Sequence, residues 1–411
     1  MNTTAGPRGA QRGRASPAGR WPVAGSLVLA LVLLATGCTL PSSRRPPLPG
    51  RTTLASPLVI LPARSIGNYL LIEAKWDRFG PYHFLVDTGS SVTLVTPALA
   101  RRYPGRNVPP SAVTTVRGAD GRVRELPRSS VRRIELGDAR FEDVEVLLYD
   151  CAPLSAHLGV RIDGVLGFPL FREVLLTLDY PGSRVLLQPA REAPLAPGEV
   201  VPFDDVHKTP LISVQLGDRS IVALIDSGSD ALFSLNPIGM TPEFIYGPVT
   251  GATVSTISGD RTQSIGRLGG ALSIGGYEFR QPVVEVTDTL SAIGGGLLRH
   301  FSVMFDQQRD RVTFYRESRE PIVTAPRPSA GVSFNKTPAY WRVEGVVPGS
   351  SAEALGIQAG DLVVRINGEP VARWDLPRYE QLVSRARDLT FTFLNGNSES
   401  EKTVKVFELV P

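Results

Sequence analysis

Short apolar runs, broken by glycine, proline and polar residues, make up most of the chain from residue 56 onward. Runs of four to eight apolar or alternating residues between such breaks are typical of β-strands. Residues 83–95, HFLVDTGSSVTLV, place two of these runs on either side of an aspartate, and residues 222–234, VALIDSGSDALFS, repeat the arrangement. Each segment therefore predicts a strand, a tight turn and a second strand, in which the glycine relieves a position where a Cβ atom would clash.

The composition fits several mainly β domains. The chain has 411 residues, of which 42% are apolar, and its 40 glycines and 35 prolines follow no fixed period. A chain of this length divides into domains and buries more than one core. We therefore expect a mainly β protein of two or three domains.

The N-terminal residues have the pattern of a secretory signal. Four arginines precede an uncharged apolar run of 13 residues at 23–35, and Cys38 follows. This run is too short to span a bilayer comfortably, although an uncleaved anchor stays open as an alternative. The hexapeptide LLATGC resembles a bacterial lipobox. The resemblance implies a signal peptide at 1–37, lipidation of Cys38, a linker at 38–55, and a membrane-anchored lipoprotein of the bacterial cell envelope that faces the periplasm.

The net charge of the chain comes from this N-terminal segment. Without residues 1–37 the chain has 40 basic and 40 acidic side chains. The basic character therefore gives no argument for a nucleic-acid partner. If Cys38 carries lipid, Cys151 is the only remaining thiol, so we expect no intramolecular disulfide.

An internal repeat relates two segments of similar length. A series of landmarks recurs in the same order at nearly constant distances from Asp87 and Asp226. The landmarks are Pro62 and Pro202, the two aspartate turns, the glycine turns at Gly137 and Gly275, and the segments LLTLDYPGSRVLL (175–187) and SVMFDQQRDRVTF (302–314). In both of the last segments an aspartate precedes an Arg-Val pair by five residues. The repeat predicts a first lobe at 56–190 and a second at 198–316.

The duplicated aspartates indicate a chemical site. A carboxylate among apolar residues is costly unless it is hydrogen-bonded or paired, and two lobes packed about a pseudo-twofold axis would bring equivalent turns together. Two carboxylates within about 3 Å share one proton and titrate as a pair. Such a pair can activate a water molecule and polarise a carbonyl group. The alternative is that each aspartate only stabilises its own turn.

The tandem DTGS and DSGS turns, with the apolar-glycine segments IDGVLG (162–167) and AIG (292–294), resemble those of retropepsin-like and pepsin-like aspartic peptidases. The resemblance covers about residues 56–316 and implies a bilobal pair of β-barrels. It implies neither a metal nor a cofactor. It also implies that hairpins at 117–123 and 257–263 cover the cleft; the alternative is that they are ordinary exposed turns. The residues that it assigns are the catalytic Asp87 and Asp226, the cross-bracing Thr88 and Ser227, the close-approach glycines Gly89 and Gly228, and the candidate carboxylate partners Ser90 and Ser229.

The C-terminal segment has a different pattern. Residues 317–330 are polar and rich in proline, which is typical of a linker. Beyond them PGSSA, AGD and INGEPV resemble the motifs of a PDZ domain of the bacterial envelope type, which implies a small domain at 331–411. A PDZ domain binds a peptide as an added strand. The loop that captures a free C-terminus should precede Val343, but the sequence there is FNKTPAYWRV.

Other peptidase classes lack their residues. GNSES (396–400) has no glycine-rich nucleophile loop, and His83, His157, His207 and His300 form no metal-binding motif. We therefore predict an aspartic endopeptidase that cuts a peptide or protein substrate as a monomer with an intramolecular pair of aspartates. A homodimeric site is disfavoured, because the chain holds both halves. The alternative function is an inactive peptide-binding or scaffold lipoprotein, because the second lobe has a DSG turn, an extra Asp230 and no Asp-Gly before Ile293.

Overall fold

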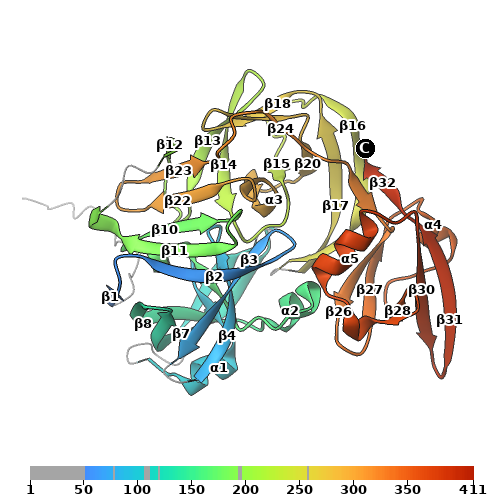
Figure 1. Ribbon diagram of the computed structural model, residues 1–411, viewed down its shortest axis with the longest axis horizontal. Helices are drawn as coiled ribbons and strands as arrows, with labels where there is room; N and C mark the ends of the chain where they lie inside the picture. The colour runs from blue at the N-terminus through green and yellow to red at the C-terminus, as the bar shows by residue number, and fades with distance from the viewer. Residues whose placement is uncertain (1–50, 77–78, 106–111, 119–120, 193–196, 257–258) are drawn as a thin grey trace, which may run out of the picture. The chain divides into compact units, whose positions relative to one another are not determined.

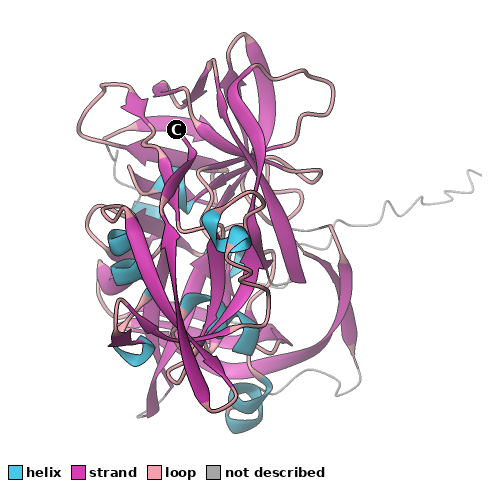
Figure 2. Ribbon diagram, turned by 90° about the vertical axis from the view of Figure 1, so that its right-hand side faces the viewer, coloured by secondary structure: helices cyan, strands magenta, loops and turns pink. Residues whose placement is uncertain are grey.

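The computed structural model describes residues 51–76, 79–105, 112–118, 121–192, 197–256 and 259–411. Every described residue belongs to one compact unit. The expected signal peptide at 1–37, Cys38 and most of the expected linker at 38–55 lie outside the described residues. In the described part of the chain, no helix is long and apolar enough to cross a membrane. Strands predominate (Figure 2), which confirms the prediction of a mainly β protein.

Lobe one is built from strands of two kinds. In β2, buried residues alternate with exposed ones over much of the strand, and at the end of β4 consecutive residues are buried. Its strands are β1 (Arg51–Leu54), β2 (Val59–Ile66), β3 (Tyr69–Trp76), β4 (Phe79–Asp87), β5 (Leu94–Val95), β6 (Val113–Arg117), β7 (Val123–Leu136), β8 (Ala139–Leu148), β9 (Gly164–Gly167), β10 (Val174–Asp179) and β11 (Arg184–Pro189). Its helices are α1 (Pro97–Arg102), α2 (Ala152–Leu158), and the short 3₁₀ turns η1 (Phe168–Phe171) and η2 (Ala190–Glu192). β1, at the end of the expected linker, pairs with β8.

Lobe two repeats this arrangement with fewer helical turns. Its strands are β12 (Glu199–Pro202), β13 (Leu211–Leu216), β14 (Arg219–Asp226), β15 (Phe233–Leu235), β16 (Phe244–Thr256), β17 (Gly259–Leu268), β18 (Ala271–Ile274), β19 (Tyr277–Arg280), β20 (Val283–Val286), β21 (Ala292–Gly294), β22 (Ser302–Asp306) and β23 (Arg311–Tyr315). The helix α3 (Gly295–Leu298) follows β21 directly. β4 pairs in parallel with β9, and β14 pairs in parallel with β21.

A shared sheet joins the lobes (Figure 1). Strand β10 of lobe one and β22 of lobe two run antiparallel, with β11 and β2 on one side and β23 and β12 on the other. Within each hairpin the repeated aspartate pairs with the arginine five residues later. Asp179 Oδ2 lies 2.6 Å from Arg184 Nε, and Asp306 Oδ2 lies 3.1 Å from Arg311 Nε. The spacing found in the sequence is therefore that of an ion pair across a hairpin, formed once in each lobe.

The C-terminal domain has its own sheet and its own core, which includes Phe334, Trp341 and Phe391. Two short strands, β24 (Ile322–Val323) and β25 (Arg327–Ser329), form within the segment expected to be a linker, because β24 pairs with β19 and β25 with β32. The domain's strands are β26 (Val332–Lys336), β27 (Trp341–Val346), β28 (Leu362–Ile366), β29 (Glu369–Pro370), β30 (Asp388–Asn395), β31 (Ser398–Lys405) and β32 (Phe407–Val410). Its helical segments are α4 (Ser351–Ala354), η3 (Val371–Arg373) and α5 (Leu376–Val383).

Candidate active site

The backbone of lobe one places Asp87 at the end of a buried strand. In the parallel pair of β4 and β9, Asp87 lies opposite Gly167, and β5 returns on the other side of β9. A Cβ atom on Gly167 would collide with the carbonyl group of Val92. The apolar-glycine segment is therefore needed so that the loop after Asp87 can pass close to β9.

Lobe two holds Asp226 in the same way. Asp226 lies opposite Gly294 in the parallel pair of β14 and β21, and a Cβ atom on Gly294 would collide with the carbonyl group of Ala231. The Asp-Gly that precedes the segment in lobe one has no counterpart, because Ser291 stands at the position of Gly164. The Ser291 hydroxyl accepts a hydrogen bond of 3.0 Å from the Asn236 backbone. The missing glycine thus leaves the pairing of Asp226 with Gly294 intact.

Four hydrogen bonds brace the two aspartate turns against each other. The Thr88 hydroxyl donates to the Ile225 carbonyl at 2.7 Å and accepts from the Ser227 backbone at 3.0 Å. The Ser227 hydroxyl donates to the Val86 carbonyl at 2.8 Å and accepts from the Thr88 backbone at 2.9 Å. Both side chains are buried. The serine of the DSG turn therefore makes the same bonds as the threonine of the DTG turn.

The brace brings the two carboxyl groups into contact. Each lies against the glycine of the opposite turn: a Cβ atom on Gly228 would lie 2.5 Å from both carboxylate oxygens of Asp87, and one on Gly89 would lie 2.6 Å from Cγ of Asp226. A hydrogen bond links the carboxyl groups of Asp87 and Asp226. Only glycine leaves room for this approach, so Gly89 and Gly228 are required by sterics at these positions.

The contact makes the two acids share a proton. Burial, followed by the charge of Asp226 and the hydrogen bond to it, raises the pKa of Asp87 well above its usual range. Burial also raises the pKa of Asp226, while the hydrogen bonds with the Gly228 backbone and with Asp87 lower it. The two acids therefore share one proton, and the pair titrates as a unit.

The serines after each turn act through their backbone or within their own loop. The Ser90 backbone N–H donates to Oδ1 of Asp87 at 3.0 Å, but its hydroxyl donates to the Val92 carbonyl at 2.7 Å. The Ser229 hydroxyl accepts from the Ala231 backbone at 3.3 Å. Among the described residues neither hydroxyl bonds a carboxylate. The loop geometry turns both hydroxyls away from the pair, which the sequence could not reveal.

Two buried tyrosines near the pair were not identified from the sequence. Burial, and then the charges of Asp230, Asp226 and Asp87, raise the pKa of Tyr69. Burial and the charges of Asp226 and Asp87 raise the pKa of Tyr180, whose hydroxyl has no hydrogen-bond partner among the described residues. Both phenols stay neutral and contribute to the low polarity around the acids. They carried no sequence signal, because each lies within or directly after a strand of apolar residues.

The two predicted hairpins differ in what surrounds them. The turn at 117–123 joins β6 and β7, and a Cβ atom on Gly121 would lie 3.4 Å from Cγ2 of Thr289 in lobe two. The turn of the second hairpin, between β16 and β17, lies outside the described residues. The first hairpin therefore contacts the segment that precedes β21, the partner strand of Asp226.

The edge of the C-terminal sheet contacts lobe one. β26 is the last strand in its sheet, and the ammonium group of Lys336 donates both to the carbonyl of Phe334 in β26 (3.1 Å) and to the carbonyl of His157 in α2 (2.6 Å). Burial lowers the pKa of Lys336 to about 8, against the opposing charge of Glu344. The segment before Val343, where PDZ domains have a carboxylate-binding loop, contains the turn between β26 and β27. Part of the edge that would accept a peptide strand is thus occupied by the chain itself.

Two family models match the chain. A model described as an aspartyl protease matches residues 73–170, and a model described as a PDZ domain matches residues 342–394. No curated protein matches the chain at a significant level of similarity. The two matches confirm the resemblance to aspartyl proteases and to PDZ domains that the motifs indicated. They support a protease-like function in general, with peptides as the class of molecule that each domain handles.

Proposed function

We propose that the chain is an aspartic endopeptidase that hydrolyses peptide bonds with a water molecule activated between Asp87 and Asp226. The observation that carries this proposal is the hydrogen bond between the two carboxyl groups, held by the four reciprocal bonds of Thr88 and Ser227. A pair that shares one proton offers a base and an acid at the same place. No covalent intermediate is needed.

Each acid transfers a proton in both steps of the mechanism. We assign the ionised role to Asp226, which takes a proton from the water while the water oxygen attacks the peptide carbonyl carbon. Asp87 donates its proton to the carbonyl oxygen, so that a neutral tetrahedral diol forms. Asp226 then returns a proton to the leaving nitrogen, the carbon–nitrogen bond breaks, and Asp87 regains its proton from the diol. The pair ends in its starting state.

The second lobe supports a working pair rather than a remnant. Its DSG turn supplies both bonds of the brace, and its glycine segment pairs with Asp226 as the first lobe's segment pairs with Asp87. These bonds hold the Asp226 turn against the Asp87 turn, so that the two carboxyl groups can share a proton. They favour the endopeptidase over the inactive binding protein.

Cleavage of a diverse peptide mixture by wild type, Asp87→Asn and Asp226→Asn tests the proposal. Each substitution keeps the size of the side chain but removes the shared proton, so we expect cleavage to fall at least about a hundredfold in each variant. The matched control is Asp230→Asn, which alters a third acid in the same turn and should keep cleavage near the wild-type rate. Circular dichroism confirms that each variant is folded.

Other outcomes point to other conclusions. Activity that survives in either variant of the pair contradicts the shared-water mechanism. A wild type that binds peptides but cuts none of them supports the alternative, an inactive peptide-binding protein.

We propose further that Cys38 carries a lipid that anchors the chain to a bacterial envelope membrane, facing the periplasm. The support for this is the apolar run at 23–35 and the LLATGC motif.

A further inference from the structure

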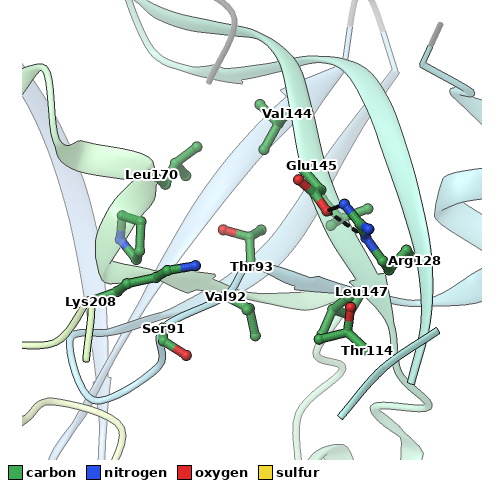
Figure 3. Close-up of a pocket in the computed structure, with 12 residues that line it drawn as sticks. Ser91, Val92, Thr93, Thr114, Arg128, Val144, Glu145, Leu147, Leu170 and Lys208 are labelled. Carbon is green, nitrogen blue, oxygen red and sulfur yellow. Dashed lines mark hydrogen bonds and ion pairs between the residues drawn. The ribbon is translucent and has the colours of Figure 1, made fainter. Parts of the chain in front are cut away.

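A cavity of about 240 Å³ lies beside the turn that carries Asp87. Its walls come from the loop after that turn, from β6, β7 and β8, from η1, and from a loop of lobe two. Figure 3 shows the Lys208 side chain extended into the cavity toward Thr93, with the Arg128 and Glu145 pair on the opposite wall. The cavity is thus lined by both lobes.

The same backbone that positions Asp87 forms one wall of this cavity. Ser91 follows Asp87 by four residues, so the two Cα atoms are at most about 14 Å apart. The Thr93 hydroxyl accepts a hydrogen bond of 3.2 Å from the backbone of Gly167, the residue opposite Asp87 in the strand pair. An extended peptide advances about 3.3 Å per residue. The cavity is therefore within reach of a side chain about four residues from a bond cut at Asp87.

The hairpin of lobe one runs between the cavity and lobe two. Thr114 of β6 and Arg128 of β7 line the cavity, and the turn of the same hairpin lies against Thr289, three residues before β21. Strand β21 contains Gly294, the residue opposite Asp226. The hairpin thus runs from the cavity to the segment of lobe two that leads into the partner strand of Asp226.

The cavity has one positive charge without a partner. Arg128 donates to Glu145 through Nε at 2.7 Å, so these two charges compensate each other. The ammonium group of Lys208 has no hydrogen-bond or ion-pair partner among the described residues. The nearby acids are engaged, since Asp205 pairs with Arg172 at 3.0 Å and Asp204 accepts from the backbone of Val206 at 2.8 Å. A cation next to the apolar walls of Val92 and Leu170 favours an anion.

The backbone at Lys208 is held in a defined position. Its φ is +62°, in the left-handed region, and its N–H donates to the Asp205 carbonyl at 2.6 Å. The next residue, Thr209, is buried. The backbone therefore fixes the position of the Lys208 Cα atom, while its ammonium group can bind a ligand in the cavity.

We propose that this cavity is a substrate subsite for a carboxylate group and that Lys208 is the residue that selects it. The proposal rests on the proposed function, because the carboxylate belongs to the peptide that is cut. Its source is the side chain of an aspartate or glutamate within about four residues of the scissile bond, or the C-terminal carboxylate of a short substrate.

The test compares cleavage preferences of wild type, Lys208→Met and Lys208→Glu on a peptide mixture varied at four positions on either side of the scissile bond. Wild type is expected to favour Asp and Glu at one position. Lys208→Met should lose about tenfold in kcat/KM for those peptides, and Lys208→Glu should favour Lys and Arg there instead. The control is Lys75→Glu, at an exposed lysine of β3, which should keep the wild-type preference.

Matched peptides separate the two sources of the carboxylate. Amidation of the C-terminus leaves the preference unchanged if an acidic side chain occupies the cavity and removes it if the terminal carboxylate does. Identical cleavage profiles for wild type and Lys208→Glu overturn the proposal.

Binding distinguishes failure of this proposal from failure of the proposed function. Fluorescence anisotropy measures the affinity of Asp226→Asn, with and without Lys208→Glu, for acidic peptides and for their amide analogues. A preference for the acidic peptides that reverses with Lys208→Glu supports the subsite even if wild type cuts nothing. Cleavage by wild type without any dependence on residue 208 supports the peptidase and refutes the subsite.

Discussion

The ionisation of the two paired acids affects the stability of the folded protein. Asp87 and Asp226 are hydrogen-bonded to each other in a buried setting, and the pKa of both is raised. The folded pair therefore binds a proton more strongly than the same acids in the unfolded chain. Because the unfolded chain releases its protons first, stability falls as pH rises through the range in which the folded pair ionises.

Asparagine in place of Asp87 or Asp226 removes this dependence of stability on pH. We expect Asp87→Asn and Asp226→Asn to raise the melting temperature at pH 7 by roughly 1 to 4 °C, and the gain to vanish below the pKa of the unfolded acids. Melting curves of each variant and wild type between pH 3 and pH 8 measure it. The control is Asp143→Asn at an exposed acid, where no such trend should appear. A gain that is independent of pH would contradict the shared proton.

The sequence identified the residues of this pair but not all of their contacts. The repeated turns predicted that Asp87 and Asp226 form a pair, and the resemblance to aspartic peptidases implied that the hydroxyls of Thr88 and Ser227 brace them. The roles of Ser90 and Ser229 could not be read in the same way, because a hydroxyl can rotate to any nearby acceptor. In lobe one the Ser90 hydroxyl donates to the Val92 carbonyl, and the Ser90 backbone N–H donates to the Asp87 carboxylate.

At the scale of elements, the brace between the two aspartate turns is the critical connection. The Ser227 hydroxyl serves the backbone of both Val86 and Thr88, which lie on either side of the catalytic candidate Asp87. A buried backbone group without a partner costs about 1 to 3 kcal/mol. The brace therefore couples the position of the pair to the stability of the interface between the lobes.

Ser227→Ala should reveal this coupling. We expect it to lower the free energy of unfolding by more than about 2 kcal/mol, because two buried groups lose their partner. Denaturation with urea measures the loss. Ser229→Ala is the matched control from the same turn, since its hydroxyl accepts one long bond from Ala231. Equal losses in the two variants would show that the brace contributes nothing particular.

The elements themselves were only partly predictable. Strands with clear apolar periods, such as β4 and β14, follow from the pattern of the chain. The short strands β24 and β25 do not, because two or three residues in a polar, proline-rich segment form a strand only when a partner edge is available.

At the scale of the whole described chain, a buried lysine links the C-terminal domain to lobe one. The ammonium group of Lys336 bonds the carbonyl groups of Phe334 and His157, and burial lowers its pKa from 10.5 to about 8. The charges of Glu344, Glu380 and Asp230 oppose this shift. Between pH 8 and pH 10.5 the unfolded chain binds more protons than the folded one, so stability relative to an uncharged variant rises with pH.

Lys336→Met tests this dependence. The difference in denaturation midpoint between wild type and the variant should shift in favour of wild type as pH rises from 7.5 to 10, because the cost of burying the charge disappears. Lys75→Met, at an exposed lysine, should show no such shift. A constant difference across this range would mean that Lys336 stays charged in the folded protein.

The sequence by itself determined the class of fold, the two lobes and the identity of the acids. These depend on local periods, on residue types required by close approach, and on a repeat, all of which are properties of the chain. Only the tertiary structure decided what these residues meet: the pairing of β10 with β22, the carboxyl contact, the lysine at the cavity, and the bond from Lys336 to lobe one. Each of these contacts joins residues that are far apart in the chain. Their packing depends on burial and sterics in the folded protein, which a local sequence pattern does not predict.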